Sequence, residues 1–183
     1  PAKRKQQKPL AAPLVLHYEF EKGSPAAAKD LSGRNNDGIV NGRPRIVRGI
    51  DGWAMRFDGI NDYIRVPRKP ELEPKRITVA AWVKMREFHP QYSMLVRKRS
   101  RSLHQNESYD LPIFPGGTYR AVVSSTNGTQ TRLDASVRVE TGVWHHVAMT
   151  FSNPELKIYV DGTLAGSRDH PYPLAHNPET DLL

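Results

Sequence analysis

The sequence predicts an all-β protein, an antiparallel β-sandwich, from three observations. The first is a pair of segments, His145–Phe151 and Leu156–Val160, in which alternate residues are apolar, so that each strand has one apolar face. The second is Asp161-Gly162, which suits the positive φ angles of a type I′ turn and predicts that Leu156–Val160 folds back onto Thr163–Ser167. The third is the spread of 15 Pro and 13 Gly along the chain without helical periodicity, which favours short strands and turns.

The other strands follow from the same alternation. The strongest is Ile77–Met85, and Asn127-Gly128 marks a turn between two later strands. Residues 30–42 are predicted to form a loop because they are rich in Ser, Gly, Asn and Asp, and three prolines bar residues 67–74 from a central strand. The expected strands are Leu14–Phe20, Ala54–Phe57, Tyr63–Val66, Ile77–Met85, Met94–Lys98, Tyr109–Ile113, Thr118–Ser124 and Thr131–Val137.

Composition excludes several classes of protein. The 183 residues, 38% of them hydrophobic, suffice for one domain with a core. The chain has no Cys, which excludes disulfides, thiolate zinc sites and Cys nucleophiles. No apolar run approaches the roughly 20 residues of a membrane span. The net charge of +8 raises the possibility of a polyanionic ligand, but the charge is concentrated in residues 1–13 and 97–101, which are expected to be a solvated tail and loop.

The domain organisation follows from these charges and from the strand pattern. We expect residues 1–13 to be a basic, disordered linker and residues 14–183 to form the sandwich. The chain opens at Pro1 without an initiating Met, so it is expected to be a piece of a larger protein. Nucleic acid is not an expected partner, because the basic tail carries no element that reads bases.

Six segments are distinctive in their order and spacing: 16–21, 30–38, 54–64, 77–83, 142–148 and 159–162. Together they resemble the laminin-G-like, concanavalin A-like jelly-roll domains, with the pentraxin-like branch the most similar. The resemblance implies two packed antiparallel sheets in an appended module of a secreted, bacterial protein, which binds glycans or neighbouring protein domains and often holds calcium in loops at one edge. Members of the family continue past a segment like Asp181–Leu183 into a last strand with an acidic pair, so we expect the sandwich to be truncated before that strand.

A ligand site is predicted where aromatic and arginine side chains alternate in the middle of the chain. Sugars stack on aromatic faces, and guanidinium groups bind carboxylate or sulfate in bidentate fashion, so such a site suits an anionic or sulfated polysaccharide. The alternative is that these aromatics belong to the core, as is expected of Trp53, Trp82 and Trp144. The predicted ligand residues are Tyr92, Arg97, Arg99, Tyr109, Tyr119 and Arg120, with Phe114 and Arg101 nearby.

The sequence also predicts a structural calcium site. Calcium takes six to eight oxygen ligands from flexible loops, and the loop at 30–38 supplies Asp30, Asn35 and Asp37, while Asp58 belongs to the next loop. The alternative is that these residues only close tight turns through their side chains.

Catalysis is not expected. Glycan-cleaving enzymes of this fold need two carboxylates over one cleft, and a Glu-x-Asp-x-x-Glu pattern is absent. His145 and His146 point to opposite faces of a strand, so they cannot share one metal ion, and a structural role is expected for His145. The sequence therefore predicts a non-catalytic carbohydrate-binding module. The rival hypotheses are a spacer or protein-docking domain without a small ligand, and a glycan-cleaving enzyme of the same fold.

Overall fold

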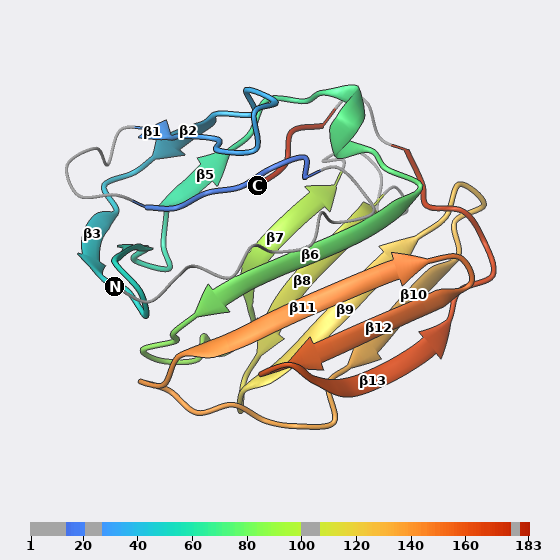
Figure 1. Ribbon diagram of the computed structural model, residues 1–183. Helices are drawn as coiled ribbons and strands as arrows, with labels where there is room; N and C mark the ends of the chain where they lie inside the picture. The colour runs from blue at the N-terminus through green and yellow to red at the C-terminus, as the bar shows by residue number, and fades with distance from the viewer. Residues whose placement is uncertain (1–13, 21–26, 100–106, 177–179) are drawn as a thin grey trace, which may run out of the picture.

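The computed structural model describes residues 14–20, 27–99, 107–176 and 180–183, which fold into two facing antiparallel β-sheets (Figure 1). One sheet has the strand order β13-β12-β11-β6, and the other has the order β10-β9-β8-β7. Two smaller sheets, β1-β2-β5 and β3-β4, lie toward one end. The elements are β1 (Ala27–Ala28), β2 (Gly38–Asn41), β3 (Arg45–Arg48), β4 (Trp53–Arg56), β5 (Tyr63–Arg65), the 3-10 helix η1 (Pro70–Leu72), β6 (Arg76–Val83), β7 (Ser93–Arg99), β8 (Glu107–Phe114), β9 (Thr118–Ser124), β10 (Gln130–Asp134), β11 (His145–Ser152), β12 (Glu155–Val160) and β13 (Thr163–Asp169).

The predicted hairpin of β12 and β13 is confirmed. Val160 pairs with Thr163 around the Asp161-Gly162 turn, where φ is 50° at Asp161 and 78° at Gly162. β11 lies between β12 and β6, and its alternate residues Val147, Met149 and Phe151 are buried. Each fully buried apolar side chain of this size stabilises the fold by about 1.5–3 kcal/mol relative to an exposed one.

The facing sheet contributes the other half of the core. In β8 and β9, alternate residues point inward and pack against the apolar face of β11 and β12. The inward side chains are Tyr109, Leu111, Ile113, Tyr119, Ala121 and Val123. The outward faces of the same strands carry Phe114 and Arg120, so the alternation fixes which residues a ligand can reach.

The C-terminal segment joins two of the sheets. Leu182 exchanges backbone hydrogen bonds with Val66, at 2.8 and 3.1 Å, and Leu183 exchanges them with Arg97, at 2.7 and 2.9 Å. Val66 directly follows β5, and Arg97 lies in β7. Residues 182–183 therefore occupy a strand position between β5 and β7 and connect the three-stranded sheet to the four-stranded one.

The prediction of a strand at Leu14–Phe20 is wrong except for one residue pair. Tyr18 forms an isolated bridge with Asp30, and no ladder extends from it in the described residues. The carbonyl of Val15 accepts hydrogen bonds from the side chains of Ser32 (3.0 Å) and Asn36 (2.8 Å). Side chains thus bind the backbone of this segment where a neighbouring strand was expected.

The pairing of the short strands near residue 55 also differs from expectation. Ala54–Phe57 and Tyr63–Val66 do correspond to β4 and β5, but they lie in different sheets: β4 pairs with β3, and β5 pairs with β2. Neither β2 nor β3 was predicted. Gly49 donates to Gly52 across the β3–β4 turn, and a Cβ on Gly49 would meet the Trp53 carbonyl at 2.8 Å. Glycine is therefore required for this turn.

Two further expectations concern the membrane and the N-terminal residues. No helix among the described residues has the length and apolar character of a membrane span. Residues 1–13, which were predicted to be a linker, lie outside the described residues.

Candidate functional site

The structure divides the predicted ligand residues between the core and the surface. Tyr109 and Tyr119 are only 3% and 0% exposed, so their rings are core residues and cannot stack on a ligand. The hydroxyl of Tyr109 donates to the carbonyl of Leu72 at 3.1 Å, and burial raises the pKa of Tyr119 to about 12. The signal was present in the sequence, because Tyr109 alternates with Leu111 and Ile113 and therefore shares their face.

The remaining predicted residues meet at the surface. Tyr92, which is 40% exposed, precedes β7, and its ring centroid lies 5.7 Å from that of Phe114 at the end of β8. The guanidinium of Arg120 lies 4.2 Å from the Phe114 centroid, and Nη2 of Arg97 lies 3.5 Å from the Tyr92 hydroxyl. We call these four side chains the aromatic–arginine cluster. The cluster offers ring faces together with hydrogen-bond donors.

Both arginines of this cluster already contact carboxylates. Arg120 forms a bidentate pair with Asp134, at 2.5 and 3.0 Å, and the hydrogen bond lowers the pKa of Asp134. Nε of Arg97 lies 3.8 Å from Oδ2 of Asp110. Most of the positive charge is therefore compensated within the protein. Arg99 ends β7 with its side chain outside the described residues, and Arg101 lies outside them entirely.

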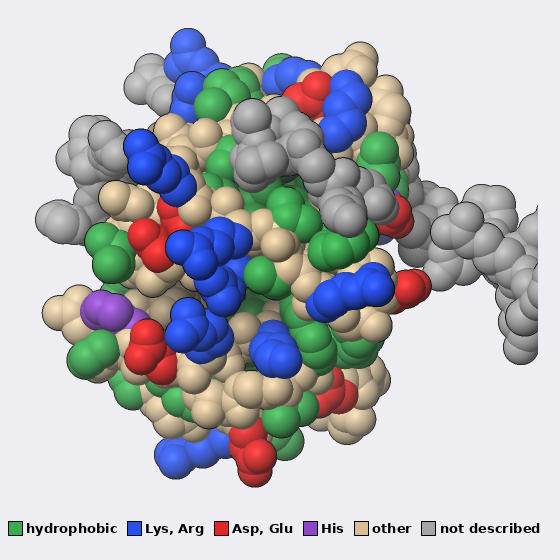
Figure 2. Space-filling model, turned by 90° about the vertical axis from the view of Figure 1, so that its left-hand side faces the viewer, with side chains coloured by type: hydrophobic (Ala, Val, Ile, Leu, Met, Phe, Trp, Pro, Cys, Tyr) green, Lys and Arg blue, Asp and Glu red, His purple; other side chains and the backbone are tan. Residues whose placement is uncertain are grey.

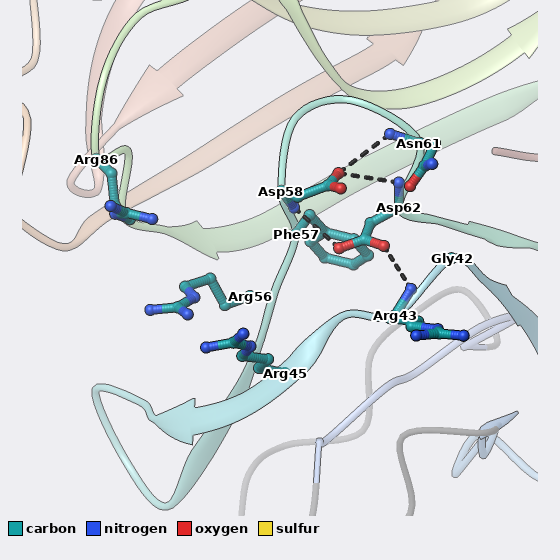
Figure 3. A pocket seen from close by; sticks show the side chains of 9 residues that line it. All are labelled: Gly42, Arg43, Arg45, Arg56, Phe57, Asp58, Asn61, Asp62 and Arg86. Atoms are coloured by element: carbon teal, nitrogen blue, oxygen red, sulfur yellow. Dashed lines mark hydrogen bonds between the residues drawn. The ribbon is translucent and has the colours of Figure 1, made fainter.

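A second candidate site was not predicted from the sequence. Lys and Arg side chains gather on the β3 side of the molecule (Figure 2). There, an open groove of about 540 Å³ lies between the β3–β4 pair, the loop at 58–62 and the chain that follows β6 (Figure 3). We call it the arginine groove, and its lining residues are Gly42, Arg43, Arg45, Arg56, Phe57, Asp58, Asn61, Asp62 and Arg86.

The positive charge in the arginine groove is not compensated by its own carboxylates. Among the described residues, the side chains of Arg45, Arg56 and Arg86 form no ion pair and no hydrogen bond. In Figure 3 these three side chains face one another across the open space, and Arg43 points to the other side. In the sequence, the groove is indicated only by the spacing of two residues between Arg43 and Arg45, because Arg56 and Arg86 come from separate segments.

The two carboxylates in the groove wall bind backbone amides instead. Oδ1 of Asp58 accepts hydrogen bonds from the N–H groups of Ile60, Asn61 and Asp62, at 2.8 to 3.1 Å, and these bonds lower the pKa of Asp58. Oδ1 of Asp62 accepts from the N–H of Arg43 at 2.6 Å, and its Oδ2 accepts from the N–H of Asp58 at 3.0 Å. Both side chains therefore shape the loop that forms one wall of the groove.

The predicted calcium ligands do not form one coordination set. The buried carboxylate of Asp30 accepts four hydrogen bonds, from the N–H groups of His17, Ser32 and Asn36 and from the Ser32 hydroxyl, at 2.7 to 3.0 Å. Burial alone would raise its pKa, but these hydrogen bonds outweigh burial and lower the pKa to about 2. A carboxylate with its lone pairs already engaged in this way does not fit a calcium ligand.

The other three predicted ligands are engaged elsewhere. Asp37 accepts from the N–H of Asp30 at 2.8 Å and pairs with Lys29 at 2.7 Å, while the carbonyl of Asn35 accepts from Lys69 at 2.7 Å. Asp58 closes its own loop. Among the described residues, no group of three or more His, Asp or Glu is arranged to hold a metal ion. Calcium binding stays a prediction, and the carboxylates of Asp30, Asp37 and Asp58 are engaged by backbone N–H groups, by the Ser32 hydroxyl or by Lys29.

The adjacent histidines of β11 diverge. Nδ1 of His145 lies 2.8 Å from Oδ2 of Asp161, whose Oδ1 accepts from the N–H of His146, also at 2.8 Å. The His146 ring packs edge-on against Trp82, with centroids 5.3 Å apart, and Trp82 is 51% exposed. The His145 ring therefore contacts the turn after β12, whereas the His146 ring contacts β6 on the other side of β11.

The features described so far define a class of protein: a domain of two facing antiparallel β-sheets with polar and aromatic side chains gathered on its surface. The chain belongs to the concanavalin A-like lectin/glucanases superfamily, whose match covers residues 58–183, more than half of the sequence. This confirms the resemblance recognised from the sequence motifs. No curated protein matches the sequence.

Solved structures show the same fold at low identity. The binding domain of Paraclostridial Mosquitocidal Protein 1 aligns with a TM-score of 0.75 at 17% identity, over 92% of this chain and 43% of that one, so this chain spans less than half of its length. Domain 4 of AbnA, a GH43 extracellular arabinanase from Geobacillus stearothermophilus solved in complex with arabinotriose, aligns with a TM-score of 0.72 at 17% identity, over 92% of this chain and 81% of that one.

Proposed function

We propose that this chain is a non-catalytic carbohydrate-binding module, and that the aromatic–arginine cluster receives a sugar. The observation that carries the proposal is the contact between Tyr92 and Phe114 on the outward face of the β7–β10 sheet, with Tyr92 open to solvent. A pyranose or furanose ring presents apolar C–H groups that pack on such rings, while its hydroxyls bind polar groups at the edge. Arg97 and Arg120 supply those donors beside the rings.

The paired arginines favour a neutral sugar at this cluster. Because Arg120 already forms two charge-assisted hydrogen bonds with Asp134, a sulfate or carboxylate there would have to displace an internal partner. A neutral hydroxyl needs only one free N–H or one oxygen lone pair, which the pairs still provide.

The same pairs support a non-catalytic role. A glycosidase needs a general acid whose pKa is raised, so that it stays protonated until it meets the leaving group. Asp134 has a lowered pKa because of Arg120, and Asp110 contacts Arg97. These carboxylates hold the arginines in place, and they do not have the environment of a proton donor.

The proposed setting is a larger protein outside the cytoplasm. The sandwich is similar to one domain of an extracellular arabinanase, which was solved with arabinotriose bound. A module of this kind would attach neighbouring domains of the parent protein to a polysaccharide.

Affinity electrophoresis through gels containing neutral polysaccharides, such as arabinan, β-glucan and mannan, tests the proposal. The protein should be retarded by at least one of them, and Tyr92→Ala should weaken binding about five- to thirtyfold, since stacking on an aromatic ring contributes on the order of 1–2 kcal/mol. The matched control is Tyr63→Ala, because Tyr63 is 41% exposed but lies on β5.

Other outcomes would contradict the proposal. Retardation that is equally lost in the Tyr92 and Tyr63 variants would show that the cluster is not the site. If no polysaccharide in a broad panel, neutral or acidic, retards the protein, the spacer or docking hypothesis replaces carbohydrate binding. Release of reducing ends from any polysaccharide would establish an enzyme.

A further inference from the structure

We infer that the arginine groove is a second binding site, which takes the carboxylate or sulfate groups of an acidic polysaccharide. The inference rests on the proposed carbohydrate-binding function and adds a chemical class of ligand that the aromatic–arginine cluster does not select. Three guanidinium groups, those of Arg45, Arg56 and Arg86, face one open space without an internal partner in the described residues.

The positions of Arg45 and Arg56 work against the stability of the β3–β4 pair. Arg45 and Arg56 lie directly opposite each other across the β3–β4 pair. Like charges in this position repel, so the pair would be weaker than a neutral or oppositely charged one. An anion bound between the two guanidinium groups offsets that repulsion, because it attracts both groups and accepts charge-assisted hydrogen bonds from them.

A neighbouring arginine of the same hairpin differs from this pair, because it has a partner within the fold. Arg48 also lies on β3, and its guanidinium sits 4.9 Å from the ring centroid of Trp53, its cross-strand partner. The hairpin thus gives one arginine a partner within the fold and leaves the Arg45–Arg56 pair directed into the groove. Packing alone explains Arg48 but does not explain the other two.

The carboxylates that line the groove do not neutralise its arginines. The carboxylates of Asp58 and Asp62 lie in its wall, yet they accept hydrogen bonds from backbone N–H groups of the loop and of Arg43. Turning either carboxylate toward the arginines would break several of these bonds. Among the described residues, the carboxylates that line the groove therefore leave the charge of Arg45, Arg56 and Arg86 available to an external anion.

The shape of the groove favours a sugar acid over other polyanions. A volume of about 540 Å³ is within the range of small-molecule sites and suits one or two sugar units. Phe57, which is 40% exposed, lines the same groove and offers an apolar face for a sugar ring. Guanidinium groups bind carboxylate and sulfate in the same bidentate manner. The ligand is therefore defined as a sugar that carries one of these two anionic groups.

Binding of defined oligosaccharides, measured by isothermal titration calorimetry on the full chain, tests this inference. The probes are a heparin hexasaccharide for sulfate, an oligogalacturonate for carboxylate, and a duplex DNA oligonucleotide as a polyanion without sugar acids. Arg45→Gln, Arg56→Gln and Arg86→Gln should each weaken binding of at least one acidic oligosaccharide about tenfold or more, because each removes charge-assisted hydrogen bonds. Arg48→Gln removes the same charge outside the groove and should leave the affinity within about twofold, since a distant exposed charge is screened by salt.

Stability provides a second readout. Arg45→Gln and Arg56→Gln should keep or raise the melting temperature while they lower the affinity, because each removes the repulsion across the strand pair. A fall in both would show that the arginines serve the fold alone and would overturn the inference. Equal loss of binding in Arg48→Gln, or DNA binding as tight as that of the acidic oligosaccharides, would show attraction by net charge only, which also overturns it.

Failure of this inference can be told apart from failure of the proposed function. Retention of neutral polysaccharide that depends on Tyr92, together with acidic binding that does not depend on the arginine groove, removes the groove and leaves the carbohydrate module intact. Absence of binding to every polysaccharide removes both.

Discussion

Lys98 Nζ lies 2.9 Å from Oε1 of Glu73, and both side chains are buried, with 0% and 7% of their surfaces exposed. Lys98 belongs to β7, whereas Glu73 follows η1, so the ion pair ties two distant parts of the chain together. The Lys98 ammonium also donates to the carbonyl of Thr180. The pair therefore anchors the C-terminal segment beside β7.

Replacing Lys98 with Met should destabilise the protein strongly. The change removes the Lys98 ammonium from the buried Glu73 carboxylate, whose Oε2 also lies 3.5 Å from Nδ1 of His176. Breaking a buried pair in this way typically costs about 3–5 kcal/mol. Urea unfolding monitored by tryptophan fluorescence measures the change. Lys84→Met, at an exposed position, serves as the control, and the double variant Lys98→Met/Glu73→Gln should recover part of the loss. No recovery in the double variant would contradict the pairing.

The Asp30 carboxylate should make stability depend on acid pH. Its folded pKa of about 2 lies below the unfolded value of 3.8, so its contribution is present above pH 4 and is lost as the pH falls through 2. The shift corresponds to about 2 kcal/mol at neutral pH. Asp30→Asn should remove this dependence and lower the urea midpoint, whereas Asp51→Asn, at an exposed position in the β3–β4 turn, should change the midpoint little. Equal effects of both variants would refute the role assigned to Asp30.

His170 should produce a separate loss of stability at a higher pH. The side chain is fully buried, its Nδ1 lies 2.9 Å from the Thr131 hydroxyl, and burial lowers its pKa below 6.5. Because the unfolded chain then binds the proton more readily, stability is complete above pH 6.5 and decreases as the pH falls below it. Unfolding midpoints at pH 7.5 and pH 5.5 should differ in the native protein, and His170→Asn should reduce the difference. A midpoint that is the same at both pH values would contradict this prediction.

Calcium should leave the melting temperature unchanged. The oxygens of Asp30 are engaged in hydrogen bonds, and Asp37 is paired with Lys29. Calcium that bound the native state would raise the melting temperature in proportion to its affinity. Thermal unfolding in excess chelator and in millimolar calcium gives the comparison, with magnesium as the control ion. An increase specific to calcium would revive the site expected from the family resemblance.

Gly42→Ala should damage the wall of the arginine groove. Gly42 has φ +85°, and a Cβ there would meet Oδ1 of Asp62 at 2.1 Å, the same oxygen that accepts from the N–H of Arg43. We expect a loss of about 1–3 kcal/mol, together with weaker binding of acidic oligosaccharides. Gly59→Ala is the control, since that glycine also has a positive φ but its Cβ would enter open space. Equal destabilisation by the two changes would mean that the contact with Asp62 is unimportant.

Local sequence was sufficient for the central strands and their turns. β6, β9, β11 and β12 were predicted nearly to their ends, because a strand alternates its side chains and Asp161-Gly162 dictates the turn that follows β12. The same alternation already contained the burial of Tyr109 and Tyr119, which share a face with aliphatic neighbours. The two tyrosines were assigned to a ligand site because they are aromatic and lie near arginines in the sequence, and this assignment disregarded the alternation.

Only the tertiary structure decided which strands pair and which charges meet. β4 and β5 are neighbours in sequence but join different sheets, and Leu182 pairs with Val66 across more than half of the chain. Arg45, Arg56 and Arg86 have no common spacing, so their convergence depends on how the β3–β4 pair packs beside the end of β6. The alternation of side chains in the sequence indicates which residues share a face of a strand. Long-range contacts determine which element packs against that face, and the arginine groove is formed by such contacts.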